Sequence, residues 1–339
     1  MDQPAAMFDE IRDAYALGGS GAPRRVGERV WHLPANDGGG VAVKLYAPEH
    51  HARAAKEAAV LAHLDTHRDT RFRVQTLQRT TSGETLWSGP DAHAMVTRWE
   101  AGQFRTYDTF SPAEWAALGA SLGALHLSLE RLHLPSLDTL RARLTAIDAD
   151  AVRRSLLDAL DRARSRDGAA NLRRYVELGL RMIDRYHPGS VEAFPADDPQ
   201  HPIHNDYNQF NYLFADTHAQ ADARMPPPLI LDWEAAIGAP REYELVRCLN
   251  HLPLEAPPLA DAFVRAYQRV RPVNPARIAW AVDAACLQHA IKLWIVRGWL
   301  DEPSRFAAHL DGAVTMASAM VDARGQLIDF FSRCVEAGT

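Results

Sequence analysis

Polar and apolar residues in the first hundred positions follow the spacing of a small sheet with two helices. Apolar side chains recur at helical spacing over residues 7–17, and Gly18-Gly19 predicts the end of that helix. Apolar stretches at 26–33 and 40–46, separated by a polar, glycine-rich turn, predict a β-hairpin. A helix is expected at 51–64, and further strands are expected at 73–78, 85–87 and 93–99.

The pattern changes near Glu100-Ala101-Gly102, after which long helical periods dominate. Helices are expected at 112–129, 139–164, 170–186, 258–270, 276–300 and 303–334. The sequence therefore predicts an α+β fold in two lobes, with a small antiparallel-sheet lobe at 1–100 and a larger, mostly helical lobe at 101–339.

Composition narrows the class of protein. The chain of 339 residues is 47% hydrophobic and contains no apolar run near the roughly 18 residues of a membrane helix. Its net charge of −6 disfavours nucleic acid as a partner. The first residues lack a secretory signal, and the three widely spaced cysteines (Cys248, Cys286 and Cys334) suit a reducing compartment. We therefore expect a cytoplasmic protein that does not associate with membranes.

One segment combines side chains suited to phosphoryl transfer. His204, Asp206 and Asn211 follow the spacing H-x-D-x-x-x-x-N, and Asp232 follows the short apolar run 229–231, which predicts a buried strand. Such a site needs a carboxylate that orients the attacking hydroxyl and accepts its proton, and it needs oxygen ligands for magnesium. Asp206 suits the first role, and Asn211 and Asp232 suit the second. As an alternative, Asp and Asn are also common turn and cap residues.

Lys44 lies within an apolar predicted strand, where an ammonium group is costly unless it faces an anion. Glu57, on the following predicted helix, could pair with Lys44 and direct it toward nucleotide phosphates. Alternatively, Lys44 is an edge residue that reaches solvent and Glu57 is solvated. The turn 36–40, Asn-Asp-Gly-Gly-Gly, offers backbone amides that could cover the phosphates, and a plain hairpin turn accounts for it equally well.

These residues together resemble a known family, the aminoglycoside phosphotransferase and choline kinase superfamily, which has the protein-kinase-like fold. The motifs that carry the resemblance are Val41-Ala42-Val43-Lys44, Glu57, His204-Asn205-Asp206 with Asn211, and Leu231-Asp232-Trp233-Glu234. The resemblance runs from about residue 25 to about residue 251. It implies an enzyme that transfers a phosphoryl group from ATP or GTP with Mg²⁺.

Carried over by position, the resemblance implies a role for each motif residue. These roles are phosphate binding by Lys44 with Glu57 as its partner, proton acceptance by Asp206, bracing of the catalytic loop by His204, and Mg²⁺ binding by Asn211 and Asp232. The segment 95–102 resembles the hinge between lobes, so the backbone of Arg98, Trp99 and Glu100 would bind the adenine or guanine edge. Residues 119–126 resemble the helix that follows this hinge.

The chain also departs from the family pattern. Many relatives have Gly, His and Pro where this chain has Asn205, Asn208 and Gln209. Glu244 stands where the family tends to have Asp, and its extra methylene should still permit a bracing hydrogen bond.

The sequence constrains the type of reaction more closely than the identity of the acceptor. We expect the phosphorylated group to be a hydroxyl of a small aminoglycoside-, choline-, sugar- or homoserine-like molecule. Four aromatic residues could enclose a quaternary ammonium: Trp280, Trp294, Trp299 and Tyr267. Alternatively, Trp280, Leu287 and Trp294 recur every seven residues, which fits a core stripe. Three acidic residues could bind an aminoglycoside or could simply be solvated: Asp197, Asp198 and Glu255. His63 and His67 lie four apart but lack an apparent third metal ligand, which favours surface histidines.

Two further functions remain open. One is a Ser/Thr protein kinase of the bacterial stress-response type, which residues 44–48 weakly favour. The other is a nucleotide-binding pseudokinase, against which the complete set of motif residues argues. A cleft that admits an extended peptide would favour the protein kinase.

Overall fold

The computed structural model describes residues 5–35, 39–134, 137–215 and 227–336. They divide into two compact units. The first, here called the sheet unit, comprises Met1–Phe110, Ala124–Leu137 and Asp206–Ala236. The second, the helical unit, comprises Ser111–Gly123, Asp138–Asn205 and Ile237–Thr339. The segment that carries Asp206 and Asp232 thus packs with the N-terminal residues, which a single division near residue 100 does not anticipate.

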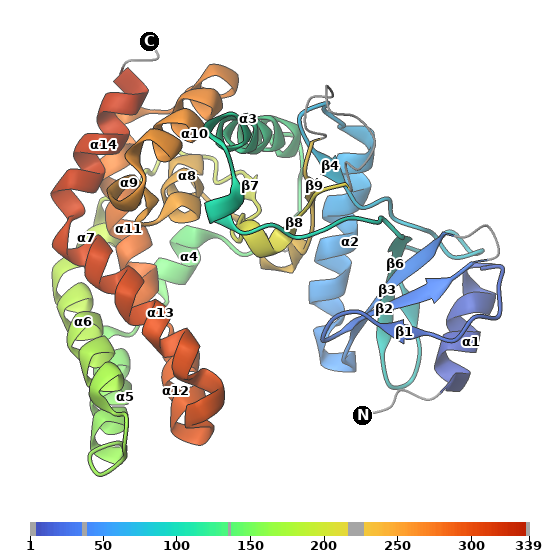
Figure 1. Ribbon diagram of the computed structural model, residues 1–339, viewed down its shortest axis with the longest axis horizontal. Helices are drawn as coiled ribbons and strands as arrows, with labels where there is room; N and C mark the ends of the chain where they lie inside the picture. The colour runs from blue at the N-terminus through green and yellow to red at the C-terminus, as the bar shows by residue number, and fades with distance from the viewer. Residues whose placement is uncertain (1–4, 36–38, 135–136, 216–226, 337–339) are drawn as a thin grey trace. The chain divides into compact units, whose positions relative to one another are not determined.

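The main sheet of the sheet unit is antiparallel, with the strand order β1-β2-β3-β6-β5 (Figure 1). Its strands are β1 (Arg24–Arg25), β2 (Val30–Pro34), β3 (Gly40–Tyr46), β5 (Trp87–Ser88) and β6 (His93–Arg98). The predicted strand at 40–46 is confirmed. The prediction of one strand over 26–33 is wrong, because the amides of Val26 and Gly27 both donate to the carbonyl of Val30 and turn the chain there.

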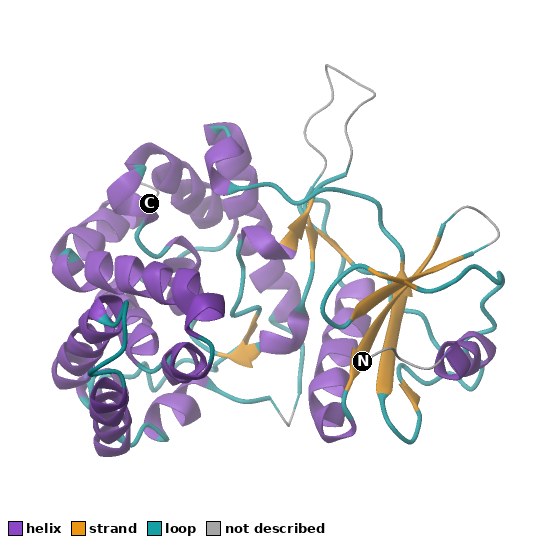
Figure 2. Ribbon diagram, turned by 60° about the horizontal axis from the view of Figure 1, so that its bottom comes forward, coloured by secondary structure: helices purple, strands orange, loops and turns teal. Residues whose placement is uncertain are grey.

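Two helices flank this sheet (Figure 2). Helix α1 (Ala5–Ala14) places Phe8 and Ile11 in a core with apolar residues of β3 and β6. Helix α2 (His51–Thr66) buries Ala54, Ala58, Leu61 and Leu64, which recur at helical spacing. Because α2 follows β3 after a short turn, the charged residues of these two elements are brought close together.

A second, small sheet in the same unit has the order β4-β9-β8. Its strands are β4 (Arg73–Val74), β8 (Tyr212–Leu213) and β9 (Leu229–Ile230). Strand β9 pairs in parallel with β4 and antiparallel with β8. The expected strand at 73–78 is therefore shorter than predicted and belongs to a sheet that the local pattern could not reveal.

The helical unit contains most of the helices (Figure 1) and a two-stranded ladder of β7 (Pro202–Ile203) and β10 (Ile237–Gly238). The helix α3 (Pro112–Leu129) begins in this unit and ends in the sheet unit. The other helices are α4 (Leu140–Thr145), α5 (Ala149–Arg162), α6 (Ala170–Tyr186), α7 (Gly189–Glu192), α8 (Arg241–Leu249), α9 (Leu252–Glu255), α10 (Pro257–Val270), α11 (Ile278–Ala290), α12 (Leu293–Asp301), α13 (Pro303–Asp322) and α14 (Arg324–Glu336).

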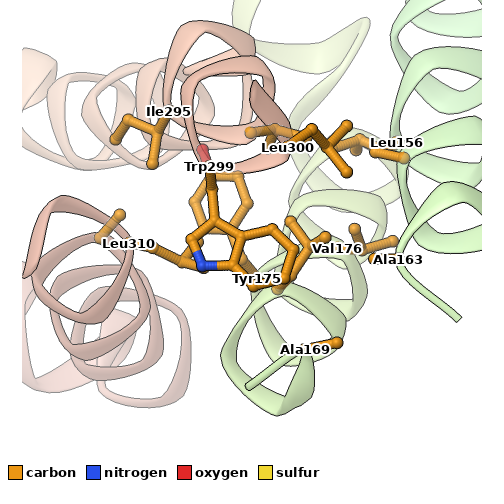
Figure 3. Close-up of a cluster of buried hydrophobic side chains, with 13 residues drawn as sticks. Leu156, Ala163, Ala169, Tyr175, Val176, Ile295, Trp299, Leu300 and Leu310 are labelled. Atoms are coloured by element: carbon orange, nitrogen blue, oxygen red, sulfur yellow. The ribbon is translucent and has the colours of Figure 1, made fainter. Parts of the chain in front are cut away.

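Apolar side chains of α5, α6, α12 and α13 form one core of the helical unit. Figure 3 shows Tyr175 of α6 and Trp299 of α12 at the centre of this cluster. The tyrosine hydroxyl donates a hydrogen bond of 2.6 Å to the carbonyl of His289, so its polar atom is satisfied inside the core. None of the helices that the structure describes has an apolar stretch long enough to cross a membrane.

Candidate functional site

A cavity of about 470 Å³ lies within the sheet unit. Its charged and amide-bearing lining residues are Glu28, Arg29, Lys44, Glu57, Gln75, Arg98, Glu100, Asn211 and Asp232. Its large apolar lining residues are Trp99, Phe104, Phe210, Leu213, Leu229 and Leu231. A pocket with apolar walls and a charged group of side chains suits a ligand that has a ring at one end and anionic groups at the other.

Lys44 is the centre of the charged group. Its Nζ lies 2.8 Å from Oε2 of Glu57 and 2.8 Å from Oδ1 of Asp232. Burial lowers the pKa of Lys44, but the negative charges of Glu57 and Asp232 outweigh that effect and raise the pKa overall. The lysine therefore carries a positive charge at neutral pH although only 13% of its side chain is exposed.

Glu57 is held from several directions. Its side chain is 1% exposed, and in addition to Lys44 it accepts a hydrogen bond of 2.5 Å from the hydroxyl of Tyr46. The backbone amide of Trp233 donates to its Oε1 at 3.2 Å. Burial and the charge of Glu57 raise the pKa of Tyr46, so the hydroxyl remains a donor. These contacts fix Glu57 and couple α2 to the loop that carries Asp232.

Asp206 accepts hydrogen bonds from two side-chain amides of its own loop. Asn208 Nδ2 donates to Oδ1 at 2.9 Å, and Asn211 Nδ2 donates to Oδ2 at 3.0 Å. Each amide also donates to the Asp206 carbonyl, at 3.0 Å and 2.8 Å respectively. The carboxylate is therefore fixed in orientation by the residues that follow it.

Strand pairing places Asn211 beside the residues that lead into Asp232. The ladder of β8 with β9 continues in a hydrogen bond of 3.0 Å from the amide of Leu231 to the carbonyl of Asn211. Asp232 then adopts a left-handed backbone, with φ of 61° and ψ of 72°, a conformation that Asp tolerates better than most residues. Asn211 and Asp232 both line the cavity.

The oxygen donors in this cavity suit a hard divalent cation such as Mg²⁺, which prefers carboxylate and carbonyl ligands. Carboxylate oxygens of Glu57, Asp232 and Glu234 lie within 4.8 Å of one another. Lys44 Nζ lies among them, with Glu234 Oε2 at 3.7 Å, so its single positive charge offsets one of the three negative charges. The expected binding of Mg²⁺ by Asn211 and Asp232 stays a prediction.

The residues just before Asp206 belong to the helical unit and are anchored there. The backbone amides of His204 and Asn205 both donate to the carboxylate of Glu244, the first at 3.1 Å. The expected bracing by Glu244 is confirmed. Arg247 Nε donates to the carbonyl of Asn205 at 3.0 Å. The His204 side chain is completely buried, and its expected bracing role stays a prediction.

The predicted hinge residues Arg98, Trp99 and Glu100 line the cavity. The amide of Trp99 donates to the carbonyl of Gly40, and its ring lies 4.3 Å from that of His32. Glu100 pairs with Arg73 at 3.0 Å. Their contact with a nucleobase stays a prediction.

Several suggested acceptor-binding groups serve the structure instead. Trp280, Trp299 and Tyr267 are all less than 10% exposed. The core-stripe interpretation holds for Trp280 and Leu287, which are buried, and not for the exposed Trp294. Asp197 and Asp198 form ion pairs with Arg277, and the Glu255 carboxylate lies 3.3 Å from His251 Nε2. No open aromatic cage is built from these residues.

His63 and His67 contact each other and the backbone: their rings stack at 4.0 Å, and each ring approaches a backbone carbonyl. Of the turn 36–40, residues 36–38 lie outside the described residues. Among the described residues, the loop 26–29 lines the cavity.

The sequence did not predict a role for Arg29, a partner for Glu234, or the bond from Asn208 to Asp206. Arg29 Nη2 lies 2.7 Å from Glu234 Oε1 although the two residues are 205 positions apart. Gly27 within a presumed strand was the available signal for a loop there.

Comparison with known proteins places this geometry in context. The model of the phosphotransferase enzyme family matches residues 21–281. No curated protein matches the chain. An aminoglycoside phosphotransferase from Alicyclobacillus acidocaldarius subsp. acidocaldarius DSM 446 is 17% identical, with a TM-score of 0.59 over 93% of this chain and 92% of that one.

Two other solved structures are similar in fold. Amicoumacin kinase hAmiN, solved with AMP-PNP, Ca²⁺ and Ami, is 12% identical, with a TM-score of 0.64 over 93% of this chain and 94% of that one. A microcompartment-associated aminopropanol kinase is 15% identical, with a TM-score of 0.57 over 98% and 100% of the two chains. At these identities the likeness shows a shared kinase-like fold. Because the family model covers most of the sequence, including the residues that build the cavity, the chain belongs to the phosphotransferase enzyme family.

Proposed function

We propose that this protein transfers the γ-phosphoryl group of ATP or GTP to a hydroxyl group of a small molecule. The observation that carries the proposal is the arrangement around Lys44, which lies 2.8 Å from both Glu57 and Asp232 in one cavity. Asn211 lines the same cavity and is hydrogen-bonded to Asp206. A cation for phosphates, oxygen ligands for a metal and an oriented carboxylate are the parts that phosphoryl transfer requires.

In the proposed reaction, the acceptor hydroxyl oxygen forms a bond to the γ-phosphorus. The bond from that phosphorus to the β–γ bridging oxygen breaks, and its electron pair leaves with the nucleoside diphosphate. Asp206 accepts the hydroxyl proton, and the amides of Asn208 and Asn211 hold its carboxylate in place.

Lys44 would contact the α- and β-phosphates while Glu57 fixes its position. Asn211 and Asp232 would hold Mg²⁺, which when bound offsets the charge that develops on the phosphate oxygens. The backbone at Arg98 to Glu100 would bind the base beside the apolar walls of the cavity.

Three observations bear on the class of acceptor, which we propose to be a small hydroxylated molecule. The structural relatives are named for aminoglycosides, amicoumacin and aminopropanol, which supports a small acceptor. A quaternary ammonium would need an open aromatic cage, whereas Trp280, Trp299 and Tyr267 are buried. The net charge of −6 supports a neutral or cationic small partner over a nucleic acid.

A screen of acceptors tests the proposal. Formation of nucleoside diphosphate from ATP and from GTP would be measured with Mg²⁺ and with aminoglycosides, aminoalcohols, choline, sugars, homoserine or a protein substrate. Turnover that depends on one small-molecule class is expected. Phosphorylation of the protein substrate alone would favour a protein kinase, and diphosphate formation with none of the acceptors would count against the proposal.

A further inference from the structure

The loop 26–29 lines the cavity, but its first amides are already in use. The amides of Val26 and Gly27 donate to the carbonyl of Val30 at 2.9 Å and 3.1 Å. The side chain of Arg25 donates to the carbonyls of Gly27 and Glu28, at 3.1 Å and 2.5 Å. The loop is thus bonded to itself, and these two amides are not available to cradle a phosphate.

Arg29, at the end of this loop, offers donors of another kind. It lines the same cavity as Lys44, and 37% of its side chain is exposed. Its Nη2 donates to Glu234 Oε1 at 2.7 Å, and its guanidinium carbon lies 5.7 Å from the centre of the Tyr46 ring. The guanidinium has five N–H donors, so the bond to Glu234 fixes its position without using the whole fork.

The charges in the cavity also require a second cation. Lys44 lies within 4 Å of three carboxylates, those of Glu57, Asp232 and Glu234. Lysine alone would leave two uncompensated negative charges where a polyphosphate must bind, and Arg29 offsets one of them. A planar guanidinium can donate two parallel hydrogen bonds to the oxygens of one phosphate, whereas an ammonium acts as a single point charge.

We propose that Arg29 is a second phosphate-binding side chain, which contacts the nucleotide's phosphate groups directly and replaces loop amides in that role. This inference rests on the proposed function, because it assumes that the cavity binds a nucleoside triphosphate. It adds a specific donor that none of the sequence motifs contains.

The test compares nucleotide binding by four purified full-length proteins: wild type, Arg29→Ala, Arg29→Lys, and the double variant Arg29→Ala/Glu234→Gln. Calorimetry would measure the affinity for Mg-ATP and Mg-GTP, and for adenosine and guanosine as ligands without phosphate. Arg68→Ala is the matched control, since Arg68 is 69% exposed, pairs with Asp65 and does not line the cavity.

We expect Arg29→Ala to weaken Mg-triphosphate binding by about tenfold to a hundredfold, as for a lost charged hydrogen bond, while nucleoside affinity is unchanged. Arg29→Lys should be intermediate, and Arg68→Ala should match wild type. The double variant should keep the loss, because removing the Glu234 charge does not restore the missing donors.

Three outcomes would overturn the inference while leaving the proposed function intact. These are wild-type triphosphate affinity in both Arg29 variants, an equal loss for nucleosides, and full recovery in the double variant, which would show that Arg29 only neutralises Glu234. A wild-type protein that binds no nucleoside triphosphate would instead overturn the proposed function, and this inference with it.

Discussion

At the residue scale, the site is a set of side chains whose positions are fixed by their partners. Lys44 and Asp232 were identifiable because they lie in or directly after apolar strands, where charge is costly, and Glu57 was identifiable as a helical partner for Lys44. The pairing of Arg29 with Glu234 was not, because an arginine near a strand has many possible partners and this one lies 205 residues away.

Asp232 is expected to provide metal-dependent nucleotide binding. In wild type, we expect added Mg²⁺ to raise the affinity for ATP or GTP by about tenfold or more, which is about 1.4 kcal/mol of binding free energy. In Asp232→Ala, added Mg²⁺ should no longer raise this affinity. Calorimetry with and without Mg²⁺ measures this. Asp65→Ala, a surface change in the same unit, is the control. An undiminished Mg²⁺ effect in Asp232→Ala would remove this residue from the metal site.

At the element scale, the long regular elements were predictable and their interruptions were not. The bounds of α3, α6 and β3 are those that the periodicity predicts. The single helix expected at 139–164 is two, because Asp148 caps α5 by accepting from the amide of Ala151. The expected helices 276–300 and 303–334 also divide, near residues 291 and 323, without an internal proline as a signal.

The short strands gave a weaker signal. The apolar run 229–231 predicted β9, whereas β8, with two residues, carries almost no periodic signal and was missed. Their pairing depends on contacts between distant segments. It nevertheless decides the site, since it places Asn211 beside the approach to Asp232.

Close packing of α3 on α10 is expected to depend on Gly119. A Cβ there would lie 2.1 Å from the carbonyl oxygen of Phe263, which is backbone and cannot move away easily. Gly119→Ala should therefore lower the free energy of unfolding by about 1–3 kcal/mol, measured by denaturant unfolding. Gly312→Ala, where a Cβ meets open space on α13, should instead stabilise by about 0.5–1 kcal/mol. Equal effects of the two changes would contradict the packing argument.

At the scale of the whole molecule, the family and the fold class could be predicted from the sequence. The residue ranges that make up each compact unit could not. The α+β, kinase-like architecture agrees with the solved relatives. The sheet unit takes in 206–236 because β9 pairs with β4, a long-range contact with no local cue. The expected division into a nucleotide-binding lobe at 1–100 and a catalytic, substrate-binding lobe at 101–339 stays a prediction.

Stability should depend on pH through a buried histidine of the helical unit. Burial lowers the pKa of His289 well below its usual 6.5. Electrostatic interactions with the nearby Lys292, Arg247 and His251 lower the pKa further. As the pH falls below about 6.5, the unfolded chain takes up a proton that folded His289 does not, so stability is lost by up to about 1.4 kcal/mol per pH unit.

Denaturant unfolding at several pH values between about 7.5 and 5 would measure this loss of stability, because an ordinary histidine titrates in roughly that range. Wild type should lose stability toward acid pH, and His289→Gln should lose less over the same range. The exposed His133→Gln should behave as wild type. The same acid dependence in His289→Gln as in wild type would show that this histidine is not responsible.

The most direct test of the central claim follows the γ-phosphoryl group itself. Wild type and Asp206→Asn would be incubated with Mg²⁺ and γ-³²P-labelled ATP or GTP in a small-molecule extract that serves as a pool of acceptors. We predict that wild type transfers label to a small molecule, and that Asp206→Asn loses about 10²-fold or more of this activity while retaining nucleotide affinity. Equal labelling by the two proteins would contradict the role of Asp206, and no labelling by wild type would contradict phosphoryl transfer.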